Sequence, residues 1–197
     1  MKNRRRILLL TLVLAVLGIA ISTERVSSAQ DGTKLPKALH IQAQAMGQST
    51  QLGQSFSLNL IIEEFSTADD QKALLQAFNE KKNEGLVNAL TKMKSKGRMA
   101  ITGTLGYDVA YARQFKLPDG STKIRLVTDR PITFGEAWSD SRSMDYSLSG
   151  VEVILTADGK KNSGILAPAC QFKLDKENQL QLELYQNEWK LVDVMKR

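Results

Sequence analysis

The chain has 197 residues, of which 42% are hydrophobic and 24% charged, and a formal net charge of +6. Residues 1–29 hold five of its basic side chains and one acidic side chain, so the rest carries 22 basic and 20 acidic groups in near balance. Without a basic stripe this balance argues against nucleic acid as a partner, and one cysteine excludes an internal disulfide.

The first 29 residues have the features of a secretory signal peptide. A basic start precedes an uncharged apolar run over residues 7–21, and small residues follow at 27–29. The run is shorter than the roughly 20 residues that cross a bilayer, so we expect cleavage and a periplasmic or secreted protein. An uncleaved anchor is the alternative, because Ser22 and Thr23 lengthen the span. In either case we expect membrane contact only through this segment.

Residues 30–37 are polar and contain glycine and proline, which predicts a flexible tether before a single domain over residues 38–197. Apolar residues then alternate with polar ones over 39–45 and again over 56–62. This period of two predicts two antiparallel strands joined by the Gly- and Ser-rich segment 47–54.

A helical insertion is predicted next. Thr67 is the expected N-cap, and Asp69 and Asp70 lie in the first turn, where they favour the helix dipole. One helix should run to about Lys81, and a second should follow and end at Gly97. Both are short, so we expect them to pack together on the sheet.

From residue 98 onward the pattern predicts strands only. Residues 107–116 and 122–128 flank a turn that contains Pro118 and Gly120. In the strand expected over 144–155 the apolar positions change from even to odd numbers at Gly150, which indicates a β-bulge. The count of about nine strands predicts an α+β fold that is mainly antiparallel β, as a sandwich or partly closed barrel, with the two-helix insertion after the second strand.

Residue types required for common catalytic mechanisms are scarce. His40 is the single histidine, and neither a G-x-S-x-G nor an S-x-x-K motif occurs. One histidine and one cysteine do not suffice for a closed zinc site, and no calcium-loop or phosphate-loop motif is present. We therefore expect no enzyme, no metal site and no cofactor. Cys170 lies on an alternating apolar face, which predicts a buried side chain rather than a reactive thiol.

The least ordinary segment is the long connection after residue 128, where aromatic, acidic and arginine side chains gather. Aromatic faces beside charged groups are suited to a binding rim, and Glu136 with Asp145 has the residue types of a glycosidase acid and base. The structural alternative is that Asp129 and Arg130 only fix a long connection. The candidate rim residues are Asp129, Arg130, Glu136, Trp138, Asp145 and Tyr146.

Several short segments together resemble a family of small uncharacterised exported bacterial proteins of β-rich fold. The resemblance spans nearly all of the mature chain and implies export, but it carries no activity and no site residues. The segments are 65–69, 105–108, 128–132, 144–146 and 151–152.

Taken together, the sequence predicts a non-enzymatic exported domain that binds an unknown small molecule or an envelope component. The first alternative is a hydrolase that acts on glycan or envelope material through carboxylates near Glu136 and Asp145. The second alternative is a structural partner in an envelope assembly, which would show an exposed apolar patch or an unpaired strand edge.

Overall fold

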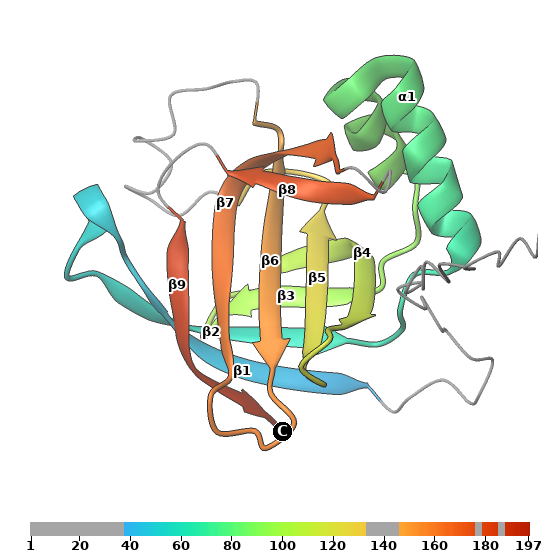
Figure 1. Ribbon diagram of the computed structural model, residues 1–197. Coiled ribbons are helices and arrows are strands. Elements are labelled where there is room, and N and C mark those ends of the chain that lie inside the picture. Colours follow the sequence, from blue (N-terminus) through green and yellow to red (C-terminus); the bar gives the residue numbers. More distant parts are fainter. Residues whose placement is uncertain (1–37, 133–145, 176–178, 185–187) are drawn as a thin grey trace, which may run out of the picture.

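The computed structural model describes residues 38–132, 146–175, 179–184 and 188–197, and within them it has nine strands and one α-helix (Figure 1). The strands are β1 (Leu39–Met46), β2 (Ser55–Ile62), β3 (Gly97–Ile101), β4 (Tyr107–Lys116), β5 (Thr122–Thr128), β6 (Leu148–Leu155), β7 (Ser163–Leu174), β8 (Leu180–Leu184) and β9 (Trp189–Lys196). The helix is α1 (Ala68–Leu90), and a short 3-10 helix, η1 (Ser49–Gln51), lies at the tip of the β1–β2 hairpin.

Eight of the strands form a closed antiparallel barrel. Their order is β6-β5-β4-β3-β2-β1-β9-β7, and β7 pairs back to β6, which closes the ring. The ninth strand, β8, pairs with β7 alone and lies outside the ring. The predicted antiparallel β-rich fold is therefore confirmed, whereas the sandwich alternative is wrong because the β6–β7 pairing joins the two ends of the sheet.

The barrel interior is filled by the alternating apolar residues that the sequence pattern identified. Ile41, Ala43 and Ala45 point inward from β1, and their neighbours on β2 do the same. The buried residues of this interior cluster are Ile41, Ala43, Ala45, Leu58, Leu60, Ile62, Met99, Val109, Ala112, Ile124, Leu126, Ile132, Val151, Val153, Leu166, Trp189, Leu191 and Val194.

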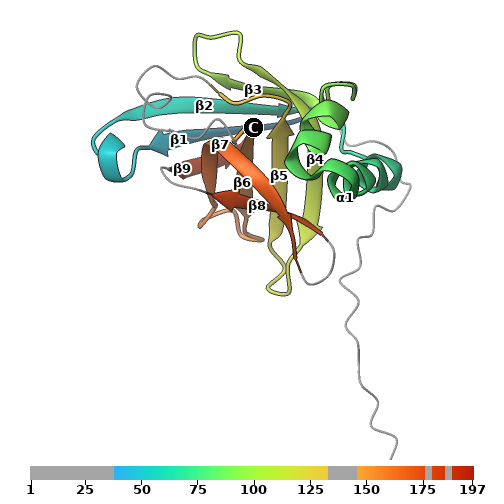
Figure 2. The same ribbon diagram turned by 90° about the horizontal axis from the view of Figure 1, so that it is seen from above.

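Strand β7 leaves the barrel halfway along its length. Its first half pairs with β9 up to Leu166, but from Cys170 onward it pairs with β8. Opposite β6, the chain from Ala167 to Cys170 advances three residues while β6 advances two, so β7 contains one additional residue at this point. The resulting β7–β8 ribbon crosses the outside of β6, as both views show (Figures 1 and 2).

A second apolar cluster, the outer cluster, lies between the barrel wall, this ribbon and α1. Its buried residues are Leu74, Phe78, Leu86, Leu90, Ala110, Tyr111, Val127, Leu148, Ala167, Cys170, Phe172 and Leu180. The cluster explains the change of parity near Gly150. Strand β6 pairs with β5 in constant register, and its outward residue Leu148 is buried here while inward Val151 belongs to the interior. The pairing of β6 with β7 does shift register between Leu148 and Gly150, where a bulge was predicted, but the additional residue lies on β7 rather than on β6.

Helix α1 begins as predicted and contains a sharp break. The Thr67 side chain accepts from the Asp70 amide and the Asp70 carboxylate accepts from the Thr67 amide, forming a capping box. Lys81 and Lys82 leave the helical conformation, and the two parts pack so closely that a Cβ on Gly85 would lie 2.1 Å from the Ala77 carbonyl oxygen. The insertion is thus one kinked helix rather than the two predicted helices.

The helix also ends earlier than predicted. Its last residue is Leu90, whereas Gly97 is the first residue of β3 and pairs with Ile62. A Cβ on Gly97 would lie 2.0 Å from the Ile61 carbonyl oxygen, so the glycine permits close approach of two strands and does not cap the helix.

Candidate functional site

The barrel does not offer its interior to a ligand, because the inward side chains fill it. Near the surface, an open groove of about 560 Å³ lies between the two parts of α1. It is lined by exposed Glu80, Lys81 and Lys92, whose charges are solvated, and by small residues of the helix. Among the described residues, we therefore looked for a binding site on the loops and on the outer wall.

The structure describes three of the six predicted rim residues. Asp129 is half-buried and Arg130 is exposed at the start of the connection after β5, and Tyr146 is half-buried just before β6. The other three, Glu136, Trp138 and Asp145, lie outside the described residues. The arrangement of the proposed acid and base therefore stays a prediction.

The segment that carries Asp129 and Arg130 is fixed by buried hydroxyl groups. Thr128 donates to the Arg130 carbonyl at 2.5 Å, and Ser149 also donates to this carbonyl, at 3.2 Å. The Ser149 hydroxyl accepts from the Ile132 amide at 2.5 Å and donates to the Pro168 carbonyl. These contacts satisfy backbone groups that no strand pairs, and they come from Thr128 and Ser149 rather than from the side chains of Asp129 and Arg130. They also fix the position of the Arg130 backbone.

A tight turn beside this segment displays an apolar side chain to water. Leu105 is 86% exposed between β3 and β4. Its loop is not loose, because the Thr104 amide and hydroxyl both donate to the Ile101 carbonyl at 2.9 Å. Gly106 has φ +75, and a Cβ there would lie 2.4 Å from the Met99 carbonyl oxygen. The fold thus holds Leu105 in solvent at a fixed position.

Charged and aromatic side chains lie on or beside strands β3 and β4, which flank the Leu105 turn. Arg98 donates to the Leu105 carbonyl at 2.9 Å and to the Asp108 carboxylate at 3.0 Å. The Arg130 guanidinium lies 5.7 Å from the centre of the Tyr107 ring, a cation–π contact between the β5–β6 connection and the first residue of β4. We call these five residues, Arg98, Leu105, Tyr107, Asp108 and Arg130, the Leu105 surface.

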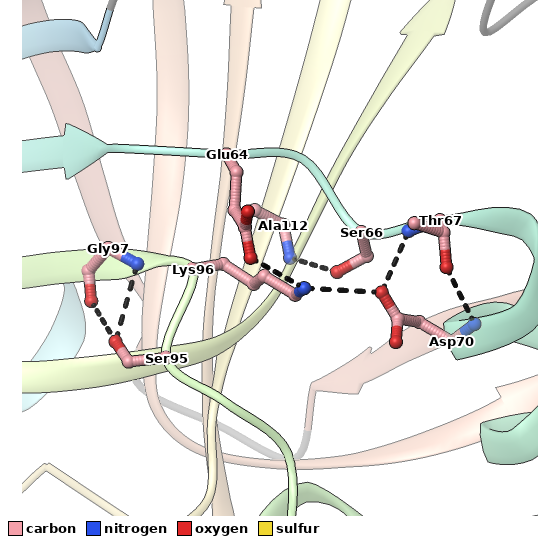
Figure 3. A network of polar contacts seen from close by, with 8 residues as sticks. All are labelled: Glu64, Ser66, Thr67, Asp70, Ser95, Lys96, Gly97 and Ala112. Atoms are coloured by element: carbon pink, nitrogen blue, oxygen red, sulfur yellow. Dashed lines mark hydrogen bonds and ion pairs between the residues drawn. The ribbon is translucent and has the colours of Figure 1, made fainter. Parts of the chain in front are cut away.

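A second polar cluster, shown in Figure 3, joins β2, α1 and β3. The Lys96 ammonium group, in a residue only 8% exposed, lies 2.9 Å from the Glu64 carboxylate and 3.4 Å from that of Asp70. Nearby, Ser66 accepts from the Ala112 amide at 3.0 Å and donates its own amide to the Ala112 carbonyl at 2.7 Å. These contacts attach the start of α1 to the barrel wall.

The ionisation of this cluster follows from its pairing. The hydrogen bond from Lys96 lowers the pKa of Glu64. Burial opposes ionisation of Asp70, yet the Thr67 amide and the Lys96 charge together hold the pKa of Asp70 below its ordinary value. Burial likewise opposes the charge on Lys96, but the two carboxylates raise the pKa of Lys96. All three groups are therefore fully charged near neutral pH, which suits a structural ion pair rather than proton transfer.

The single cysteine of the chain does not offer a reactive thiol. Cys170 is fully buried, as predicted, and burial raises the pKa of its thiol to about 12. Among the described residues no group of three His, Cys, Asp or Glu side chains is placed to hold a metal ion. In the same part of the chain no helix has the length and apolar character needed to cross a membrane.

Sequence reasoning found Arg130 but not the rest of the Leu105 surface. Leu105, Tyr107 and Asp108 belong to one of the segments that carry the family resemblance, whereas Arg98 had no signal of its own. The register of β3 and β4, which pairs Arg98 with Asp108, brings them together. Neither family models nor curated proteins nor solved structures gave a match to this chain.

Proposed function

We propose that the chain is an exported, non-enzymatic binding domain that recognises an envelope component through the Leu105 surface. The observation that carries this proposal is the combination of exposed Leu105, on a turn held by hydrogen bonds, with the contact between Tyr107 and Arg130. Exposing a large apolar side chain at a fixed position gives nothing to folding, but it provides a preorganised contact for a partner.

The neighbours of Leu105 support the same function. Tyrosine and arginine are the residue types that contribute most to binding energy in protein interfaces, and here Tyr107 and Arg130 are already in contact. Because that contact orders both side chains before a partner arrives, little conformational entropy is lost on binding. The filled barrel interior directs any ligand to such a surface.

Site-specific photo-crosslinking in the cells that produce the chain tests the proposal. A benzophenone amino acid at position 105 should give an adduct of one discrete mass, and Arg130→Ala in the same chain should reduce its yield about fivefold. The control position is Lys160, which is exposed on the β6–β7 turn. Equal adducts from both positions, or an adduct that Arg130→Ala leaves unchanged, would contradict the proposal.

The hydrolase alternative has a separate test, because it depends on Glu136 and Asp145. Purified peptidoglycan incubated with the chain should remain intact. Release of soluble fragments that Glu136→Gln abolishes would favour the hydrolase instead.

A further inference from the structure

The outer wall of the barrel carries a group of cations that the Leu105 surface does not include. Arg113 and Phe115 on β4 pair directly with Arg125 and Lys123 on β5. Residues two apart on a strand point to the same side, so all four side chains share one face of this hairpin. They lie at the opposite end of β4 from Tyr107 and Leu105.

The three cations converge on the aromatic ring. The charged groups of Arg125, Lys123 and Arg113 lie 5.2, 5.3 and 5.5 Å from the centre of the Phe115 ring. Because a ring has only two faces, at least two of the cations lie over the same face. The attraction of the ring partly offsets their mutual repulsion, but it adds no negative charge.

Among the described residues, a carboxylate pairs with one of these cations. Arg125 is 4% exposed and pairs with Glu152, with its Nε 2.6 Å from Oε1, and it also donates to the Leu180 carbonyl. Burial raises the pKa of Tyr111, so this neutral side chain supplies no negative charge to Arg113. Among the described residues no carboxylate lies within 4.0 Å of the Arg113 or Lys123 charges. The three cations and the Glu152 carboxylate together carry a net charge of +2, an excess of positive charge.

The pairing register makes this excess unfavourable for the protein alone. Arg113 and Arg125 are directly opposite on adjacent strands, where like charges destabilise a sheet. Both Arg113 and Lys123 are half-buried, so water screens them less than it screens fully exposed charges. A ligand that supplies negative charge would remove this repulsion.

We propose that this cationic cluster, Arg113, Phe115, Lys123 and Arg125, binds a phosphate monoester group. Such a group carries about −1.5 to −2 charges at pH 7, which matches the excess, whereas a single carboxylate leaves one charge uncompensated. The arginine fork is suited to two phosphate oxygens, and a lysine ammonium supplies a point charge beside them. The Phe115 ring offers apolar contact to whatever bears the phosphate.

Calorimetric titration of the purified chain at low ionic strength tests the site with glycerol 3-phosphate, inorganic phosphate and acetate. Both phosphates should bind saturably, and acetate should bind at least about tenfold more weakly. The double variant Arg113→Gln/Lys123→Gln should lose at least about tenfold in phosphate affinity. The control Lys160→Gln removes an exposed lysine from the β6–β7 turn and should leave the affinity unchanged.

Thermal unfolding shows whether the double variant still folds. Removing two mutually repelling cations should leave its Tm equal to or above that of the unchanged chain. Phosphate should raise the Tm of the unchanged chain only.

Sedimentation with vesicles distinguishes the source of the phosphate group. Binding to phosphatidylcholine vesicles that contain phosphatidate, but not to phosphatidylcholine alone, would identify a lipid headgroup if free phosphate competes for it. Saturable binding of the soluble phosphates without vesicle binding would identify a soluble monoester. Absence of both, equal binding of acetate, or equal affinity in the double variant would overturn the proposal.

Discussion

The barrel interior and the outer cluster are both well buried, but they are built differently. The interior is mainly apolar, because most of the backbone groups of each strand pair with its two neighbours, and buried Thr128 and Ser149 bond the backbone where the connection after β5 begins. In the outer layer α1 and the β7–β8 ribbon lie outside the closed ring, and polar side chains attach them: Asn83 bonds both backbone groups of Phe172, and Arg125 donates to β8. The ring therefore depends mainly on apolar alternation and strand pairing, whereas the layer outside it also depends on specific polar contacts with α1 and β8.

The largest effect is expected in the interior. Leu126 is fully buried at the centre of β5, so Leu126→Ala should lower the free energy of unfolding by about 2–5 kcal/mol. The matched control is Leu105→Ala, which removes the same atoms from an exposed position and should cost less than about 0.5 kcal/mol. Urea denaturation measures both, and equal costs would contradict the packing described for the interior.

A smaller effect is expected for a polar contact of the outer layer. Asn83 donates to the Phe172 carbonyl at 3.2 Å and accepts from its amide at 2.7 Å, in place of a neighbouring strand. Asn83→Ala leaves both groups unsatisfied and should cost about 1–3 kcal/mol in the same denaturation assay. Asn79→Ala, at an exposed position of the same helix, should be nearly neutral. If both variants have the same free energy of unfolding, Asn83 does not hold the helix to the β7–β8 ribbon.

Acid should weaken the attachment of α1 before it affects the interior. The pKa values of Glu64 and Asp70 lie below 4.5 and 3.8, so their stabilising contribution is complete above about pH 5 and is lost as pH falls through the lowered values. The raised pKa of Lys96 acts in the opposite pH direction. Its stabilising contribution is complete at lower pH and is lost as pH rises above 10.5. Denaturation midpoints between pH 2 and 7 should show this acid slope, and Lys96→Met should reduce it. An unchanged slope in that variant would exclude the ion pairs as its source.

The smallest effect is expected at the kink of α1. Lys82 has φ 50 and ψ −136, a conformation that glycine adopts far more readily than other residues. Lys82→Gly should therefore stabilise the chain by about 0.5–1 kcal/mol, although it loses the contact between the Lys82 ammonium and the Phe78 ring. Lys81→Gly provides the control, since Lys81 has negative φ and should gain nothing. A destabilised Lys82→Gly would show that the break is not strained.

Sequence reasoning was most successful where one physical rule decides the structure. Alternation identified the inward residues of β1 and β2, and the side-chain chemistry of Thr67 identified the start of α1. The turn at Pro118 and Gly120 was also confirmed, because Leu117 and Ser121 close it with a backbone hydrogen bond of 3.0 Å. Each of these features depends on residues close together in sequence or on a strict period.

The errors have a common cause in long-range contacts. The parity change at Gly150 suggested a bulge, but β6 is regular and its outer face is covered by β8: a Cβ on Gly150 would lie 2.6 Å from a Leu182 methyl group. The sequence also left a sandwich and a partly closed barrel as alternatives, since closure depends on pairing between β6 and β7 and between β1 and β9.

For the candidate sites, the sequence indicated Arg130 and missed most of the other residues. Arg130 stood out because its segment is unusual in composition, but its contact with Tyr107 depends on the fold. The cationic cluster had a local signal that was overlooked. Arg113 with Phe115 and Lys123 with Arg125 are spaced two apart on either side of a predicted turn, so the hairpin register alone places all four on one face.

The pairing of β1 with β9 sets the order in which this fold can be completed. These strands are the first and last of the barrel in the chain, and at least five residue pairs join them, from Ile41 with Lys196 to Met46 with Lys190. Until β9 is available, β1 and β7 each present an open edge with unpaired backbone groups. Ring closure therefore waits for nearly the whole polypeptide, which favours slow folding and makes incomplete chains prone to aggregate.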